Sequence, residues 1–390
     1  MKIAVSAYDI SPPGTLGGNT RILLEYLKVW GCSEDITIFT TPSGFETFKR
    51  YGLHDKFQFK VLALPEFFWK KFYARQIFLP LFLMPVIFET GKTKFDLVYT
   101  ATDFISDVFF GWLLKIRSAS SLRWLSSITL FILPPWSKNR DYGDIRYFPR
   151  IKYLCYWLYQ KIIIFLSTAS DMMFVTNELD KNLVTRPQKE NILAVYGGID
   201  FATASKTKKT TMKYDCVFVG RLHPQKGVPL LIHAWKSIHS LRPESRLAII
   251  GNGEEKYVDE LKDLARKERV CGSIDWLGFL DGTDKYSVFS KSRIFLHTSV
   301  YDNFGMAAAE AMGAGLPTVL FDIPAQRYSY PKGVLRARFL DTSDFAVKVQ
   351  HLLESEEHYV VLSKEAQEYA KSLDWNVRAA RALEFIRARL

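Results

Sequence analysis

The chain has 390 residues, of which 48% are hydrophobic and 24% charged, a composition that excludes a disordered or fibrous protein. The length is too great for one ordinary core, so we expect two domains of near-equal size. No apolar run is long enough to span a bilayer, and the four cysteines form no CxxC pair, which argues against a zinc site or a disulfide framework. The net charge of +11 suits an anionic partner: a membrane surface, a lipid phosphate or a nucleic acid.

Short apolar runs alternate with amphipathic stretches along both halves of the chain. Residues 2–7 form an apolar run, followed by a Pro/Gly loop and an amphipathic stretch over 20–30. Residues 215–220 repeat this order, with the loop RLHPQKG and a helical stretch over 228–239. Further strands are expected at 36–40, 97–100, 172–176, 246–251, 294–297 and 318–321. This alternation predicts two doubly wound α/β domains with parallel sheets, which bind ligands at the carboxyl ends of their strands, in a cleft between the domains.

The polar, small and basic segment at 197–213 is the expected linker between the domains. We therefore place an N-terminal Rossmann-like domain at 1–198 and a C-terminal one at 199–375.

The stretch VYDNFGMAAAEAMGAGLPTVLFD, at 300–322, follows one of the expected strands. A turn at 302–305 precedes a helix expected from Met306 to about Gly313, whose first N–H groups can bind phosphate oxygens. Alanines keep this helix slim, so that Glu310 can accept hydrogen bonds from a ribose diol and Asp302 can reach beyond the phosphates. The alternative is an alanine-rich core helix, with Glu310 solvated and Asp302 as an N-terminal cap.

A second loop, VGRLHPQKG, places Arg221 and Lys226 five residues apart after a strand. Two cations there can hold a diphosphate, the arginine through forked hydrogen bonds and the lysine as a point charge. A solvated basic turn is the alternative for such a pair.

Four motifs in this order, FVGRLHPQKG, IIGNGEE, WLGFL and DNFGMAAAEAMGAGLPTVLFD, resemble the retaining, nucleotide-sugar-dependent glycosyltransferases of the GT-B fold, family 4. The clear match covers about residues 214–327. The resemblance implies two Rossmann-like domains facing a central cleft, with a last helix at about 376–390 that crosses back to the first domain. It also implies metal-independent chemistry and no cofactor apart from the nucleotide-sugar donor.

The resemblance assigns roles residue by residue. It implies catalytic roles for Arg221 and Lys226 at the donor diphosphate and for Asp302 at the sugar. The implied donor-binding residues are Gly17, Gly18, Gly278, Phe304, Gly305, Met306 and Glu310. The glycines at 17 and 18 match the glycine-rich loop that lets the backbone approach the donor phosphate, although two glycines before a helix can also form a simple tight turn.

The sequence departs from the family pattern at two points. The pattern has glutamate where this chain has Asp302, which is shorter by one methylene, so its contacts to the sugar hydroxyls must be rearranged or made through water. Many relatives carry a first-domain histidine, but this chain has none between His54 and His223. Asp103 is available instead, either to orient the acceptor or sugar or to cap the following helix. We interpret His297 as a core histidine.

Aromatic and basic residues gather in the first half. Residues 66–88 hold eight aromatics and three cations, and residues 115–161 hold nine Lys/Arg against two Asp. This pattern favours an anionic membrane surface, with an ordinary core beneath a solvated basic face as the alternative. Nucleic acid fits the charge, but no nucleic-acid motif is present.

These patterns together predict a cytoplasmic glycosyltransferase, peripheral on the inner face of the cell membrane. It would transfer a sugar with retention to a lipid-linked or glycan acceptor, in the synthesis of cell-surface polysaccharide or glycolipid. The alternatives are a sugar-nucleotide-binding scaffold without transfer activity and a GT-B sugar-nucleotide epimerase.

Overall fold

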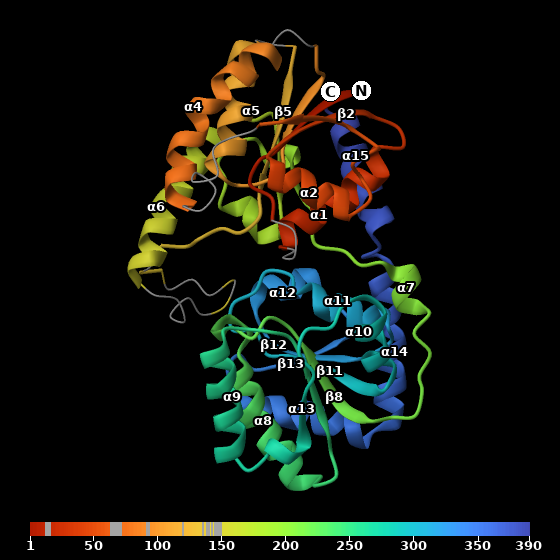
Figure 1. Ribbon diagram of the computed structural model, residues 1–390. Coiled ribbons are helices and arrows are strands. Elements are labelled where there is room, and N and C mark those ends of the chain that lie inside the picture. The colour runs from red at the N-terminus through yellow and green to blue at the C-terminus, as the bar shows by residue number, and fades with distance from the viewer. Residues whose placement is uncertain are drawn as a thin grey trace. The chain divides into compact units, whose positions relative to one another are not determined.

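The computed structural model describes residues 1–11, 17–62, 72–90, 94–118, 121–134, 136–137, 141, 143 and 150–390. It divides the chain into two compact units (Figure 1). Unit 1 comprises Met1–Ser137, Arg150–Gly197 and Asn376–Leu390, and unit 2 comprises Lys138–Pro149 and Gly198–Trp375. Within the described ranges, no helix combines the length and the apolarity that crossing a membrane requires.

Unit 1 contains a parallel sheet of seven strands in the order β3-β2-β1-β4-β5-β6-β7. Its strands are β1 Lys2–Ala7, β2 Asp35–Thr40, β3 Gln58–Val61, β4 Leu97–Thr100, β5 Arg123–Ile128, β6 Met172–Val175 and β7 Ile192–Ala194. Its helices are α1 Gly18–Trp30, α2 Pro42–Arg50, α4 Phe72–Thr90, α5 Ile105–Arg117, α6 Arg150–Ser167 and α15 Trp375–Arg387, with the 3-10 turns η2 Glu178–Asn182 and η3 Lys189–Asn191.

Unit 2 contains a parallel sheet of six strands in the order β10-β9-β8-β11-β12-β13. Its strands are β8 Tyr214–Val219, β9 Leu247–Ile250, β10 Ile274–Trp276, β11 Ser292–His297, β12 Thr318–Phe321 and β13 Val334–Ala337. Its helices are α7 Phe201–Ser205, α8 Val228–Leu241, α9 Glu255–Lys267, α10 Gly282–Ser290, α11 Met306–Gly313, α12 Pro324–Ser329, α13 Thr342–Glu354 and α14 Glu356–Lys371, with η4 Pro224–Lys226 and η5 Cys271–Ser273.

Hydrophobic periodicity explains why these segments form their elements. β1 and β4 read as continuous apolar runs because both faces of a parallel sheet are covered by helices. In α8, the buried side chains Leu231, Trp235 and Ile238 recur at helical spacing and face the sheet. The core of unit 2 is built from this stripe, the inner faces of α9 and α13, and the strands between them.

Both sheets reverse their strand order at one internal position. In unit 1 the reversal lies between β1 and β4, and in unit 2 between β8 and β11. The loops that leave neighbouring strands at such a position diverge to opposite faces and open a crevice at their carboxyl ends, where doubly wound sheets bind ligands. This topology brings the loop after β8 next to the loop after β11.

Helix α15 belongs to unit 1, although it ends the chain. The Trp30 indole N–H donates to the Ala379 carbonyl at 2.9 Å, and Phe385 packs against Phe174. The Arg389 side chain donates to Asn191 at 3.0 Å.

The expected linker at 197–213 is an ordered part of unit 2 for most of its length. Ile199 forms a β-bridge with Asp374, the segment includes α7, and the Lys209 ammonium donates to the Ser292 carbonyl at 2.8 Å. The expected linker segment thus packs within unit 2, and the division between the units lies at its start, between Gly197 and Gly198.

Candidate active site

The loop after β8 carries the two predicted diphosphate ligands. Arg221 is exposed and, among the described residues, its guanidinium has no hydrogen-bond or ion-pair partner. Lys226 ends the turn η4, and Gly227 follows with φ +62°. A Cβ on Gly227 would lie 2.0 Å from the Thr298 carbonyl oxygen, so only glycine allows this loop to approach the loop after β11.

Hydrogen bonds join these two loops. The Val300 amide donates to the Gln225 carbonyl at 2.9 Å, and the Gln225 side-chain amide donates to the Tyr301 carbonyl at 2.8 Å. The Thr298 hydroxyl donates to the Lys226 carbonyl at 3.1 Å. The position of Lys226 is thus set by the loop that carries Asp302, although 76 residues separate the two.

Asp302 is buried and forms an ion pair with Lys226, whose ammonium nitrogen lies 2.6 Å from the Asp302 Oδ2. The His297 Nε2 lies 3.4 Å from the same oxygen. Burial alone would raise the pKa of Asp302, but Lys226 and His297 outweigh it and hold that pKa well below its usual range. Asp302 is therefore an ionised hydrogen-bond acceptor and a weak base. The Lys226 ammonium has three N–H donors, and its contact with Asp302 uses one of them.

The histidine that we interpreted as a core residue is part of this site. His297 ends β11, is buried, and lies with its Nε2 2.8 Å from the Gln326 side-chain nitrogen of α12. Gly305 adopts φ +80°, and a Cβ there would lie 2.8 Å from the imidazole Cε1. The imidazole thus supports both Asp302 and the glycine that opens α11. The feature of the sequence that could have indicated this role is the position of His297 at the carboxyl end of an expected strand, where ligand-binding loops begin.

The start of α11 presents backbone donors, as the sequence predicted. The helix begins at Met306, where Gly305 to Ala307 are partly exposed. Phe304 is buried and stacks on Tyr330 at 5.3 Å between ring centroids, so its ring supports the turn before α11. The Tyr330 hydroxyl donates to the Gly305 carbonyl at 2.8 Å, which holds the turn. The turn before α11 is thereby held in place, and helix N-termini of this kind are suited to binding anions.

Glu310 lies one turn into α11, is mostly buried and forms an ion pair. The Lys285 ammonium of α10 donates to the Glu310 Oε2 at 2.9 Å and to the Asp281 Oδ1 at 3.1 Å. Lys285 is only 6% exposed. Its burial alone would lower its pKa, but the two carboxylates outweigh that effect and raise the pKa above its ordinary value. No local sequence pattern singles out Lys285, because its partner Glu310 lies 25 residues away.

Gly278 lies where the loops after β9 and β10 meet. It adopts φ +67°, and its carbonyl accepts a hydrogen bond from the Gly251 amide at 2.7 Å. This bond places the loop that we expect to frame the nucleotide base beside the end of β9.

In unit 1, Gly17 directly precedes α1, which begins at Gly18. The Gly17 amide donates to the Ser11 hydroxyl at 3.0 Å, and a Cβ on Gly17 would lie 2.9 Å from that oxygen. The first part of this loop, residues 12–16, lies outside the described residues.

Asp103 follows β4 and is buried, and burial raises the pKa of its carboxyl. It accepts hydrogen bonds from the Thr129 hydroxyl at 3.0 Å and the Thr129 amide at 3.3 Å. It does not cap the following helix, since Phe104 is the N-cap of α5 and no side chain caps it. The capping alternative is thus wrong. Thr129 also lines a small pocket with Asn19, Ser127 and Thr176 at the carboxyl ends of β5 and β6.

Two further carboxylates, Asp9 and Asp107, lie buried at the reversal of the first sheet, and the sequence analysis did not single them out. Asp107 accepts from the Ser6 hydroxyl at 2.5 Å, from the Tyr8 amide at 2.8 Å and from the Thr102 hydroxyl. Burial, and next the nearby charge of Asp9, raise the pKa of Asp107 to about 6. These contacts tie the loop after β1 to the first turn of α5, which indicates a structural role.

Among the described residues, no group of three or more His, Cys, Asp or Glu side chains is arranged to hold a metal ion.

Comparison with known proteins identifies the class of the second unit. Residues 201–369 match the model of the family described as Glycosyl transferases group 1. Over 139 residues the chain is 32% identical to glycogen synthase of Mycobacterium tuberculosis, a match that covers 35% of this chain and 33% of that protein. Over 184 residues it is 28% identical to mannosylfructose-phosphate synthase of Agrobacterium fabrum, covering 44% and 40%. The chain thus matches well under half the length of these relatives.

Solved structures match the whole chain. HepE of Anabaena, crystallised with UDP, superimposes with a TM-score of 0.75 at 16% identity, covering 100% of both chains. Sucrose-phosphate synthase of Thermosynechococcus elongatus gives a TM-score of 0.71 at 16% identity, covering 99% of this chain and 98% of that one. The fold is GT-B, as predicted. The match to the glycosyl transferases group 1 model lies within its second unit.

Proposed function

We propose that the protein is a retaining, metal-independent glycosyltransferase. It transfers a sugar from a nucleoside-diphosphate sugar to a lipid-linked or glycan acceptor, in the synthesis of cell-surface polysaccharide or glycolipid. We further propose that it acts in the cytoplasm, peripherally on the inner face of the cell membrane. The group 1 domain supports transfer as the activity, and the UDP and UDP-glucose complexes of HepE support a uridine nucleotide as the first donor to test.

One observation carries the proposal. At the strand reversal of unit 2, the sheet topology brings together the loop after β8, with Arg221 and Lys226, and the loop after β11, with Asp302 and the N-terminus of α11. Cations and helix amides are donors suited to a diphosphate, while the ionised Asp302 is an acceptor suited to sugar hydroxyls. Glu310, one turn further along α11, is an acceptor suited to the ribose diol.

The proposed reaction breaks the bond between the anomeric carbon and the β-phosphate oxygen and forms a bond from the acceptor oxygen to the same face of that carbon. Arg221, Lys226 and the α11 amides stabilise the charge on the departing diphosphate. The acceptor proton passes to the departing phosphate oxygen. Asp302 does not take this proton, because its low pKa makes it a weak base; it orients the sugar through hydrogen bonds.

The test is binding of UDP-, GDP- and ADP-sugars measured by thermal shift and calorimetry. Arg221→Ala is the sharper variant, since this exposed side chain makes no contact that the fold requires, whereas Lys226 also holds Asp302. Arg266→Ala on α9 is the matched control, because it removes the same charge from an exposed ion pair with Asp263. We expect one nucleotide sugar to bind wild type and the control, and to bind Arg221→Ala roughly tenfold more weakly.

Product analysis then separates the activities. Incubation with donor and a lipid or glycan acceptor is expected to give a glycosylated acceptor with the anomeric configuration of the donor. Conversion of donor alone to an isomer would identify an epimerase. Folded protein that binds no nucleotide sugar would overturn the proposal.

A further inference from the structure

Helix α6 exposes an apolar stripe to solvent. Its exposed apolar side chains lie at spacings of three, four, four and three residues: Ile151, Leu154, Leu158, Ile162 and Phe165. At about 100° per residue, all five fall within an arc of about 80°. Their exposed fractions range from 37% for Leu154 to 80% for Ile151.

The opposite side of α6 is already used for the core. Ile163 and Gln160 are buried there, and Tyr159 and Leu166 pack against the cluster formed by α4, α5 and the sheet. The helix is thus apolar on both faces. A helix that is apolar all round is ordinarily covered on all sides, so its outer stripe calls for a partner that covers it.

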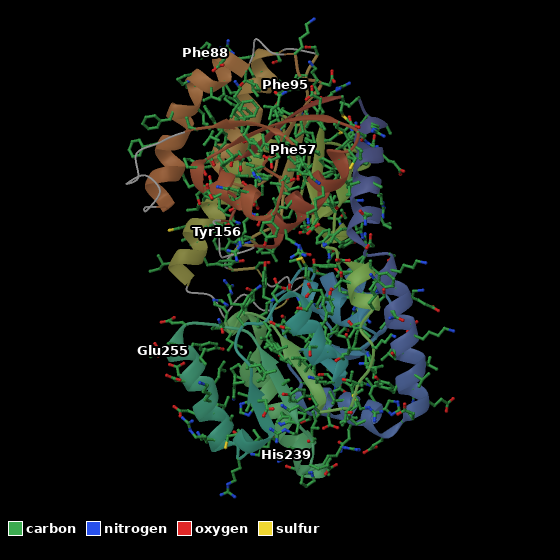
Figure 2. The ribbon with its side chains drawn as sticks, turned by 45° about the vertical axis from the view of Figure 1, so that its right-hand side comes forward. Phe57, Phe88, Phe95, Tyr156, His239 and Glu255 are labelled. Atoms are coloured by element: carbon green, nitrogen blue, oxygen red, sulfur yellow. The ribbon has the colours of Figure 1, made fainter. Side chains whose placement is uncertain are left out.

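Helix α4 also exposes apolar side chains on this flank of unit 1. Leu83 and Ile87 of α4 are buried in the same core cluster, whereas Phe78, Phe82 and Phe88 are exposed. Both helices pack against α5, and Figures 1 and 2 show them on the same flank of unit 1, with Phe88 and Tyr156 labelled in Figure 2. We define the α4–α6 face as the eight exposed residues Phe78, Phe82, Phe88, Ile151, Leu154, Leu158, Ile162 and Phe165.

Cations and indole rings border the α4–α6 face. The Arg117 guanidinium lies 4.0 Å from the centroid of the Phe88 ring, and the Lys161 ammonium lies 5.5 Å from the Trp157 ring. The exposed Trp136 ring packs edge-on against Trp157 at 5.1 Å. Indoles and lysines beside an apolar stripe match the headgroup region of a bilayer, where the rings settle and the cations meet phosphates.

The charge of α6 decides between the possible occupants. Its sequence contains Arg150, Lys152 and Lys161 and no acidic residue. In a symmetric contact between two copies of the chain through α6, the same basic segment would face itself, and like charges would repel. An anionic lipid surface is instead complementary to it, and residues 1–195 as a whole carry 24 basic against 17 acidic side chains.

We propose that the α4–α6 face docks unit 1 onto the surface of a bilayer that contains anionic lipid. The exposed residues enter the headgroup region, and neither helix crosses the membrane. This inference deepens the membrane association proposed above and rests on that part of the proposed function. Its test uses no sugar transfer, so its failure is distinguishable from failure of the catalytic proposal.

The test is co-sedimentation of the full chain with vesicles of phosphatidylcholine, with or without one quarter phosphatidylglycerol. We expect binding to the mixed vesicles at low salt, weakened at about 1 M salt and in pure phosphatidylcholine. Leu158→Glu combined with Ile162→Glu is expected to reduce the bound fraction at least about tenfold, because it places two carboxylates in the stripe.

The matched control is Val360→Glu combined with Val361→Glu, which makes the same charge change at two exposed valines of α14. It should bind vesicles like wild type, and both double variants should keep the wild-type circular dichroism. Equal loss in both double variants, or no binding of wild type to mixed vesicles, would overturn the proposal. A lipid-free wild-type dimer that the α6 variant converts to monomer would assign the face to a second copy instead.

Discussion

The pairing of Lys285 with Glu310 leads to a quantitative prediction for Lys285→Met. The substitution removes the ammonium that two carboxylates share and leaves a side chain of similar length. The Asp281 side chain is 59% exposed and is hydrated by solvent, so the loss of its ion pair with Lys285 costs little. Glu310 is only 19% exposed and keeps a charge that has lost its partner.

The magnitude follows from that burial. Removing one partner of a fully buried ion pair costs about 3–5 kcal/mol, and partial hydration of Glu310 reduces this to about 2–3 kcal/mol. The double variant Lys285→Met with Glu310→Gln has no unpaired charge at this position. We expect it to be less destabilised than Lys285→Met alone, with a coupling energy of about 2 kcal/mol.

Urea unfolding of wild type, the two single variants and the double variant measures this coupling. Isothermal calorimetry on the same proteins compares UDP with inorganic pyrophosphate. If Glu310 binds the ribose, Lys285→Met should weaken UDP binding roughly tenfold, because the free carboxylate loses its orientation, and pyrophosphate binding should be unchanged. Additive unfolding energies, or a UDP affinity equal to that of wild type, would refute the reasoning.

Three other predictions address the supports of the site. His297→Leu removes the imidazole that helps to hold the pKa of Asp302 low, so we expect the free energy of unfolding to fall by about 1–2 kcal/mol. The low pKa of folded Asp302 stabilises the fold fully above the pKa that this carboxyl has in the unfolded chain, and that stabilisation is lost as pH falls. Acid unfolding monitored by circular dichroism should therefore begin at higher pH in this variant, and an unchanged acid transition would contradict this. The pKa of Asp107 in the folded protein is raised to about 6, so ionisation of this carboxyl opposes folding at any pH above its pKa in the unfolded chain. Relative to wild type, Asp107→Asn should therefore gain about 1 kcal/mol more unfolding free energy at pH 7.5 than at pH 5 in urea titrations. A difference from wild type that does not depend on pH would count against this. Gly227→Ala should lower the free energy of unfolding by more than about 2 kcal/mol in the same titrations. Gly52→Ala is the control, because Gly52 has a similar φ of +65° but open space around its Cβ, and it should lose only about 1 kcal/mol. Equal losses would show that no close approach is involved.

Every strand that was predicted from the sequence is present in the structure, and each is an interior strand of its sheet. Residues 2–7, 97–100 and 318–321 coincide with β1, β4 and β12. The four edge strands, β3, β7, β10 and β13, were not anticipated. β3 pairs along one side only and its residues are mostly exposed, so it lacks the continuous apolar run that marks an interior strand. β7 and β10 have three residues each, which is too short for a recognisable strand pattern. β5 was missed because two serines interrupt its pattern.

The sequence by itself determined the local chemistry of the site. It indicated the cations of the loop at 221–226, the start of a slim helix at Met306 and the carboxylate one turn later, because turns and helix starts depend on residues close together in the chain. Only the tertiary structure decided that Lys226 meets Asp302, that His297 supports both Asp302 and Gly305, and that Lys285 holds Glu310. These contacts arise from the order of strands within a sheet and the packing of separate helices, which bring together residues that no local periodicity connects.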